Sequence, residues 1–392
     1  MLNILYIETG TQGGGSFESL YLLLKHIDRS KYNPIVLFLN HTRYVELVKS
    51  LNIQVHTFKD PVYTINSNRI LLRIMRLFRL LFNLYQTYIS IIGEYILHYS
   101  LIKYASELAI KEKIEIIHCN NHINRNFFCN FIARKLNLIL ISHTRTFSVE
   151  GFNRYKAGYS NKVVAKYIAV SARVKELWVK HGLDDKRIKV IHNGIESVKV
   201  NKINIRDKLK ICDNNKKVLA VVGSYNHARG YELMLEALSL LVRKGSGYCL
   251  VIIGPDTKEA LTSLVKELRL ESYVYFTGQV ERAVDYIANI DLLIIPYSVE
   301  PFGRTLLESW MVKTPVILSD INYIRDVVVA GKNCILFNYG NAADLAAKVE
   351  NLLKDKEMVR DMVENGYTFV NKRFNIKQCV KKIEEIYQEI LA

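Results

Sequence analysis

Short β-branched runs alternate with helix-like segments along the whole chain, and this alternation restricts the fold more than any other feature. The runs of the first half read NILYIE, PIVLFLN, IQVHTF, IEIIHCN, LILISHT, KYIAVS and IKVIHNG. The runs of the second half read VLAVVGS, YCLVIIG, YVYFTGQ, DLLIIPY, PVILSD and NCILFNY. Strands that are separated by helices pair in parallel, and apolar runs of this kind are typical of strands covered on both faces. We therefore predict an α/β protein with two doubly wound parallel sheets.

A polar, Lys- and Asn-rich stretch, residues 196–217, separates the two sets of runs and predicts a linker. We expect Rossmann-like domains at residues 1–195 and 196–375 that face each other across a cleft. A last helix within residues 376–392 is expected to cross back to the first domain. Asn193 and Gly194 predict a tight turn into the linker. Ligands of such sheets bind beyond the carboxyl ends of the strands, so residues that follow strands are the candidates for a site.

The net charge of +16 indicates an anionic partner but does not distinguish nucleic acid, an anionic membrane surface and a diphosphate. Lys and Arg occur in both halves without a nucleic-acid-binding motif, which disfavours nucleic acid. The six cysteines form no C-x-x-C pair, which predicts buried free thiols in a reducing compartment. The first residues lack the features of a signal peptide, and the longest apolar stretch is shorter than the roughly 20 residues of a membrane span. We therefore expect a cytoplasmic protein.

The segment EPFGRTLLE, residues 300–308, follows the run DLLIIPY and opens a helical pattern. A helix that begins near Gly303 directs free N–H groups and the positive end of its dipole at a ligand, which suits a diphosphate. Glu300 and Glu308 can accept hydrogen bonds from the hydroxyl groups of a sugar or a ribose. Considered one at a time, each of these two residues could also be an ordinary solvent-exposed surface residue.

Two glycine-containing loops lie between a strand run and a helical pattern. In the loop from Gly223 to Gly230, Arg229 can neutralise a diphosphate at the start of a helix. The N-terminal loop with Gly14 and Gly15 allows close approach of an anionic or acceptor group. This loop is not a G-x-G-x-x-G sequence and no acidic residue ends the second strand, which disfavours NAD binding.

Residues 300–308 resemble the E-x7-E motif of retaining glycosyltransferases of the GT-B fold, family 4, the glycosyl transferases group 1. The resemblance extends over most of the chain, through residues 167–196, 273–280 and 331–349. It implies transfer of a sugar from a nucleotide-diphosphate sugar to an acceptor hydroxyl with retention of the anomeric configuration. The implied process is the synthesis of bacterial cell-surface polysaccharide or glycolipid, and the implied acceptor is a glycan or a lipid-linked glycan.

On the donor side, the resemblance implies that Glu300 contacts the donor sugar and Glu308 the ribose hydroxyls. The backbone at Phe302 and Gly303 meets the sugar or the phosphate, and Val280 belongs to the turn under the base.

Within the loop from Gly223, family members carry an Arg after the first glycine and a Lys before the second. This chain has Ser224 and Arg229 at those places. The resemblance places Gly14 and Gly15 opposite the donor phosphates, and His143 toward the reaction centre.

No D-x-D sequence is present, so we expect a metal-independent reaction with Arg229 and helix N-termini stabilising the diphosphate, and no cofactor. The open alternatives are a nucleotide-sugar epimerase or a phosphorylase on the same scaffold, and a non-catalytic nucleotide-sugar-binding module that lacks the partner at Ser224.

Residues 69–84 combine an arginine stripe with a wide apolar face on a helical wheel. This pattern predicts a helix on the inner face of the cytoplasmic membrane, held by an anionic surface. An ordinary amphipathic helix that covers the first sheet would have the same pattern.

Overall fold

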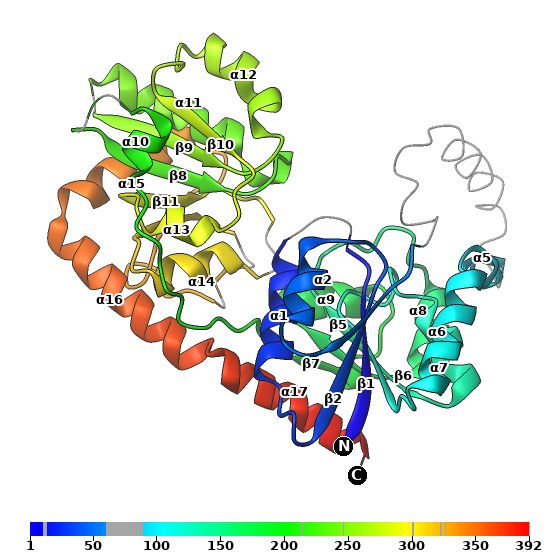
Figure 1. The fold of residues 1–392 in the computed structure, drawn as a ribbon. Coiled ribbons are helices and arrows are strands. Elements are labelled where there is room, and N and C mark those ends of the chain that lie inside the picture. Colours follow the sequence, from blue (N-terminus) through cyan, green and yellow to red (C-terminus); the bar gives the residue numbers. More distant parts are fainter. Residues whose placement is uncertain are drawn as a thin grey trace. The chain divides into compact units, whose positions relative to one another are not determined.

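The structure is a computed structural model, which describes residues 1–10, 14–59, 89–211, 213, 215–245, 247–299, 302–321, 324–325 and 327–391. The chain forms two compact units (Figure 1). Unit 1 comprises Met1–Gly194 and Ile376–Ala392, and unit 2 comprises Ile195–Asn375. Every strand run named above forms a strand, and each unit holds one parallel sheet with helices, which confirms the predicted α/β class.

The sheet of unit 1 has seven strands in the order β3-β2-β1-β4-β5-β6-β7. Their bounds are β1 (Leu2–Glu8), β2 (Tyr32–Phe38), β3 (Gln54–Thr57), β4 (Ile116–Cys119), β5 (Ile139–Thr144), β6 (Val164–Ala169) and β7 (Ile188–Val190). Consecutive residues of β1, from Ile4 to Ile7, are fully buried, because helices cover both faces of the sheet. The register of β1 and β4 places Tyr6 beside His118.

The helices of unit 1 are α1 (Gly15–His26), α2 (Arg43–Lys49), α5 (Ile89–Leu97), α6 (Tyr99–Lys111), α7 (Cys129–Leu136), α8 (Arg154–Val163), α9 (Ala172–Lys180) and α17 (Ile376–Leu391). Helix α17, drawn in red, packs beside α1 (Figure 1). Its Tyr387 hydroxyl lies 2.9 Å from the hydroxyl of Tyr6 and 2.6 Å from Nδ1 of His118. A Cβ atom at Gly194 would lie 2.6 Å from Cα of Ile376, so only glycine allows this approach of α17.

The sheet of unit 2 has six strands in the order β10-β9-β8-β11-β12-β13. Their bounds are β8 (Lys217–Val222), β9 (Tyr248–Ile253), β10 (Val274–Gly278), β11 (Leu292–Ile295), β12 (Val316–Ser319) and β13 (Ile335–Phe337). The helices are α10 (Ile205–Leu209), α11 (Tyr231–Arg243), α12 (Thr257–Glu267), α13 (Ala283–Ile287), α14 (Arg304–Met311), α15 (Ala342–Lys354) and α16 (Lys356–Arg373). The core combines the apolar face of α11 with alternate residues of the central strands.

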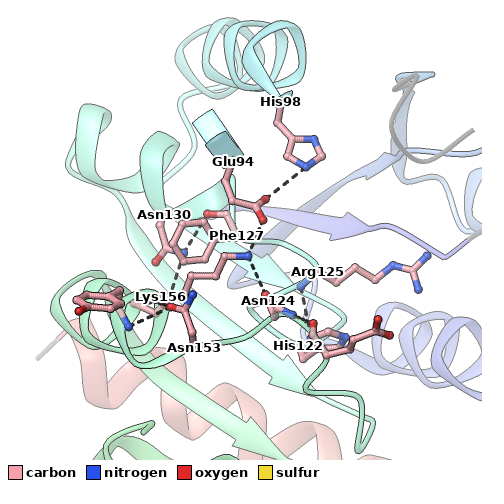
Figure 2. A network of polar contacts seen from close by, with 12 residues as sticks. Glu94, His98, His122, Asn124, Arg125, Phe127, Asn130, Asn153 and Lys156 are labelled. Carbon is pink, nitrogen blue, oxygen red and sulfur yellow. Dashed lines mark hydrogen bonds and ion pairs between the residues drawn. The ribbon is translucent and has the colours of Figure 1, made fainter. Parts of the chain in front are cut away.

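A partly buried ion pair joins α8 to α5 in unit 1. The ammonium group of Lys156 lies 2.5 Å from the carboxylate of Glu94 and 3.3 Å from the amide oxygen of Asn124, and Figure 2 shows both contacts. The Glu94 carboxylate also lies 3.7 Å from the ring of His98, and Lys156 lies over the ring of Phe127. Because a buried charge is costly without its partner, this network holds the two helices in one arrangement.

Two local expectations need correction. No turn forms at Asn193 and Gly194; instead the Asn193 side chain accepts a hydrogen bond from Arg145, and Gly194 packs against α17. The stretch 196–217 is also more than a connection, because α10 forms within it. The predicted membrane helix at residues 69–84 lies outside the described residues.

The cysteines of the described chain are buried free thiols, as expected: Cys119, Cys129, Cys249, Cys334 and Cys379. In the part of the chain that the structure covers, the helices are too short or too polar to cross a membrane.

Candidate functional site

In the unit 2 sheet the chain first adds strands on one side of β8 and then on the other side, so β8 and β11 form a topological switch point. From β8 it proceeds outward to β9 and β10, and it returns to the other side of β8 with β11. Gly223 follows β8 directly, and Tyr297 lies two residues after β11. The carboxyl ends at such a switch point are where parallel α/β sheets bind ligands.

Glycines let the loops at this switch point touch each other. A Cβ atom at Gly254, after β9, would lie 1.9 Å from the carbonyl oxygen of Gly223. A Cβ atom at Gly230 would lie 2.0 Å from the carbonyl oxygen of Pro296, after β11. Gly230 also has a φ of +64°, which L side chains rarely adopt. No other residue fits at these two positions without moving backbone.

Arg229 occupies the centre of this cluster. Its guanidinium carbon lies 4.5 Å from the centre of the Tyr297 ring, at a distance typical of cation–π contacts. The Tyr297 hydroxyl donates a hydrogen bond to the carbonyl oxygen of Val222, and the Tyr231 hydroxyl donates one to that of Gly223 over 2.6 Å. These bonds tie both aromatic rings to the end of β8, so the cation is held at the switch point.

Helix α14 begins where the sequence predicts, with Gly303 at its N-cap and a φ of +83°. Gly303 and Tyr297 line the same small apolar cavity, which places the N-terminus of α14 near the switch point. The ring of Phe302 is buried against Phe374, with ring centres 5.5 Å apart, so its backbone is the part that can meet a ligand.

Of the two carboxylates of the E-x7-E motif, only Glu308 belongs to the described residues. Glu308 lies in the second turn of α14, and its Oε1 atom is 3.1 Å from Nε of Arg304, one turn earlier. Both side chains of this pair are mostly buried, with 18% and 19% exposure. Glu300 lies outside the described residues.

Val280 stands apart from these residues. It is half-buried and follows β10, the edge strand, which is two strands away from β8. The structure therefore brings together Gly223, Arg229 and Gly303, and leaves Val280 at the side of the sheet.

The sheet of unit 1 has an equivalent switch point between β1 and β4. Glu8, the last residue of β1, is fully buried there. Its Oε1 atom accepts hydrogen bonds of 2.7 Å from the backbone N–H of Gly10 and from the amide of Asn121, and its Oε2 atom accepts one from the amide of Asn120. Burial raises the pKa of Glu8, and the bond from Asn120 opposes this rise.

His143 lies on β5, at the same edge of the unit 1 sheet, and only 2% of its surface is exposed. Its Nδ1 atom lies 3.1 Å from Nη2 of Arg145, whose Nε atom donates to the backbone oxygen of Asn120 at 3.2 Å and to its Oδ1 at 3.0 Å. Burial lowers the pKa of His143 well below its usual range, and the charge of Arg145 acts in the same direction.

The N-terminal glycine loop joins this edge through Asn120, whose amide also donates to the carbonyl oxygen of Ser16 over 3.0 Å. Gly14 is the N-cap of α1 and Gly15 its first residue, and both are exposed. A Cβ atom at Gly14 would meet no described atom within 4 Å, so packing within the described chain does not require glycine at this position.

Sequence reasoning did not single out Glu8, Asn120 and Arg145, which connect these parts. The signal that could have found them is their position, because they end or follow three strands that lie next to each other, β1, β4 and β5. Among the described residues, no cluster of His, Cys, Asp or Glu has the composition of a metal site.

Comparisons with known proteins find a glycosyltransferase family in each of the two units. The family described as "Glycosyl transferases group 1" matches residues 201–369, and "Glycosyltransferase Family 4" matches residues 13–198. The N-acetyl-alpha-D-glucosaminyl L-malate synthase of Bacillus anthracis is 24% identical over 302 residues, covering 73% of this chain and 77% of that protein. The capsular polysaccharide biosynthesis glycosyltransferase CapM of Staphylococcus aureus is 23% identical over 272 residues, covering 66% of this chain and 71% of that protein.

Among solved structures, Anabaena HepE in complex with UDP and glucose superimposes with a TM-score of 0.79 at 18% identity. The superposition covers 99% of this chain and 100% of that chain, so the whole described fold is shared.

Proposed function

Because the chain belongs to family 4 of the GT-B glycosyltransferases, the glycosyl transferases group 1, we propose that it transfers a sugar from a nucleoside-diphosphate sugar to an acceptor hydroxyl with retention of the anomeric configuration. In this reaction the bond between the anomeric carbon and the diphosphate oxygen breaks, and a bond from the same carbon to the acceptor oxygen forms. The acceptor proton passes to the departing diphosphate.

The observation that carries this proposal is the position of Arg229 at the switch point of unit 2, beside Gly223 and over Tyr297. A fixed guanidinium suits a diphosphate, because its planar N–H groups match phosphate oxygens and their charge opposes the charge that develops on the leaving group. The N-terminus of α14 at Gly303 adds free N–H groups and a favourable dipole.

The binding test is calorimetric titration of the protein with UDP, GDP and ADP and with the corresponding sugar nucleotides. At least one nucleoside diphosphate should bind, and the Arg229→Ala variant should bind it more weakly. If none binds at millimolar concentration, the proposed donor class is wrong. NMR of the product, with a simple glycoside as acceptor, then reports whether the anomeric configuration is retained or inverted.

Ser224 favours a second candidate, a binding module without transferase activity. This residue is exposed at the place where family members carry an arginine, so the second cation of the donor site is missing there. Donor turnover separates the two candidates: a binding module binds the sugar nucleotide but releases no nucleoside diphosphate, with or without an acceptor. An epimerase would release the nucleotide without any acceptor.

We propose that no metal ion or cofactor takes part, since Arg229 and helix N-termini supply the positive charge that a metal would otherwise provide. Activity in excess chelator should equal activity without it. A loss that magnesium or manganese restores would overturn this part of the proposal.

The proposed acceptor is a glycan or lipid-linked glycan at the inner face of the cytoplasmic membrane, in cell-surface polysaccharide or glycolipid synthesis. In support, the helices that follow residues 69–84 expose large apolar side chains, including Ile92, Tyr95, Ile96 and Tyr99. Exposed apolar and aromatic groups favour a membrane interface.

The membrane test is flotation of the full chain with anionic and neutral vesicles at low and high salt. Binding to anionic vesicles at low salt should be lost when Arg73 and Arg76 are both changed to Glu. Unchanged binding of this variant, or no binding by the wild type, would contradict the membrane assignment without touching the transferase proposal.

A further inference from the structure

The contact between His143 and Arg145 determines which ring nitrogen of the histidine carries the proton. Nη2 of Arg145 lies 3.1 Å from Nδ1 of His143. A guanidinium can only donate hydrogen bonds, so Nδ1 must be the acceptor in this pair. In a neutral imidazole the other nitrogen then holds the hydrogen. His143 is thus the Nε2–H tautomer.

Other N–H groups of Arg145 are bonded elsewhere, which keeps the guanidinium from turning away from His143. Nε donates to the backbone oxygen and to Oδ1 of Asn120, and Nη1 donates to Oδ1 of Asn193. The amide of Asn120 is in turn oriented by Glu8, because its Nδ2 atom donates to the buried carboxylate. The chain of contacts runs from Glu8 through Asn120 and Arg145 to His143.

The Nε2 atom of His143 has no hydrogen-bond partner among the described residues, although it is buried. The ring of His118 has its centre 5.6 Å away, and its Nδ1 atom is bonded to Tyr387. Its buried Nε2 atom also has no hydrogen-bond partner among the described residues. A buried N–H donor without a partner costs free energy and marks a place where a ligand can supply the missing acceptor.

We propose that Arg145 is a positioning residue that holds His143 as a neutral Nε2–H donor, so that His143 donates a hydrogen bond to an oxygen of the sugar or the acceptor and does not act as a base. The identity of the ligand rests on the proposed transferase function, whereas the tautomer does not. A donor at Nε2 recognises a hydroxyl or ether oxygen through its lone pair. The same nitrogen cannot take a proton while it carries one.

The position of a proton on a histidine ring can be read directly by NMR. In protein labelled with ¹⁵N-histidine, two-bond ¹⁵N–¹H correlation spectra distinguish a protonated from an unprotonated ring nitrogen. The chain has ten histidines, and the His143→Gln variant identifies the signals of His143. We expect an unprotonated Nδ1 and a protonated Nε2 throughout the range from about pH 6 to 8, around the ordinary histidine pKa of about 6.5.

The Arg145→Met variant removes the donor to Nδ1, and its His143 signals should change to a mixture of tautomers. The matched control is Arg125→Met, because Arg125 lies at the same edge and donates to the carbonyl oxygen of Thr9 over 2.9 Å, without a bond to His143. In this control the His143 signals should stay as in the wild type. Should Arg145→Met not fold, Arg145→Ala also removes the donor to Nδ1 and takes its place, whereas Arg145→Lys keeps a donor and should retain part of the wild-type tautomer.

Turnover provides a second test of the role of Arg145. Losing one oriented donor should lower kcat by about tenfold in Arg145→Met, with partial recovery in Arg145→Lys, while the affinity for nucleoside diphosphate is unchanged. A wild-type spectrum with the proton on Nδ1, or an unchanged tautomer in folded Arg145→Met, would overturn the proposal. Failure to bind any nucleoside diphosphate would instead refute the proposed function and leave the tautomer standing.

Discussion

The guanidinium group of Arg229 lies against the backbone of Gly223, where a Cβ atom would come within 3.1 Å of its Cζ, Nε and Nη1 atoms. Gly223 has a φ of +143°, a value that L side chains rarely adopt. Glycine is therefore required at position 223 by the backbone conformation and also by the close contact with the Arg229 side chain.

The Gly223→Ala variant should lower the free energy of unfolding by about 1–3 kcal/mol through backbone strain and should weaken binding of nucleoside diphosphate, because Arg229 must move. The control is Gly245→Ala, where φ is +74° but a Cβ atom would meet nothing within 4 Å. Denaturant unfolding and calorimetric titration measure the two effects. Equal losses of affinity in both variants would show that the contact with Arg229 is irrelevant to binding.

Replacing Arg229 itself tests the charge and the planar group separately. Arg229→Ala should reduce turnover by about 100-fold or more, as expected for removal of one group that stabilises developing negative charge. Arg229→Lys should retain part of the activity, since it keeps the charge without the planar set of donors. Steady-state kinetics with the donor found by titration provides the measurement, and wild-type turnover in both variants would remove Arg229 from the site.

Glu308 is predicted to bind the ribose hydroxyls of the donor. Glu308→Gln should weaken nucleoside-diphosphate binding by about 1.5–3 kcal/mol, the range for hydrogen bonds to charged groups. The wild type should prefer a ribonucleoside diphosphate over its 2′-deoxy analogue, and the variant should lose this preference.

Arg304→Gln is the matched control for Glu308, because it breaks the same 3.1 Å ion pair from the other side. This variant should keep the preference for ribose. If both variants lose affinity equally and the preference persists in each, Glu308 acts only by holding its helix in place.

Three buried histidines make stability depend on pH. Burial lowers the pKa of His118 and His122 to about 3, and that of His143 well below its usual range. Below about pH 6.5 the unfolded chain binds protons that the folded chain does not, so each histidine lowers stability by up to about 1.4 kcal/mol per pH unit as the pH falls. Glu8, whose pKa is raised, acts in the opposite sense, since its contribution is lost as the pH rises through the folded value.

Urea unfolding at pH 7, 6 and 5 should therefore show decreasing stability, and His122→Gln should reduce the dependence by the share of one histidine. The same slope in the variant and the wild type would contradict the assignment of His122 as a buried neutral residue.

The sequence by itself determined the strands and the class of fold. Runs such as LNILYIE and VLAVVGS are mostly apolar, short and rich in β-branched residues, which is typical of a strand covered on both faces. It also placed the start of α14 at Gly303 and predicted Arg229 and His143 next to strand ends, because these are local properties of a few consecutive residues.

What only the tertiary structure decided is which strand ends lie next to each other. Glu8 and Asn120 are 112 residues apart and meet because β1 pairs with β4, a pairing that results from the packing of the whole sheet. Arg229 reaches Tyr297 only because β11 lies beside β8. Local propensity and hydrophobic period describe neighbours in the chain, whereas the sites arise from contacts whose chain separation carries no local signal.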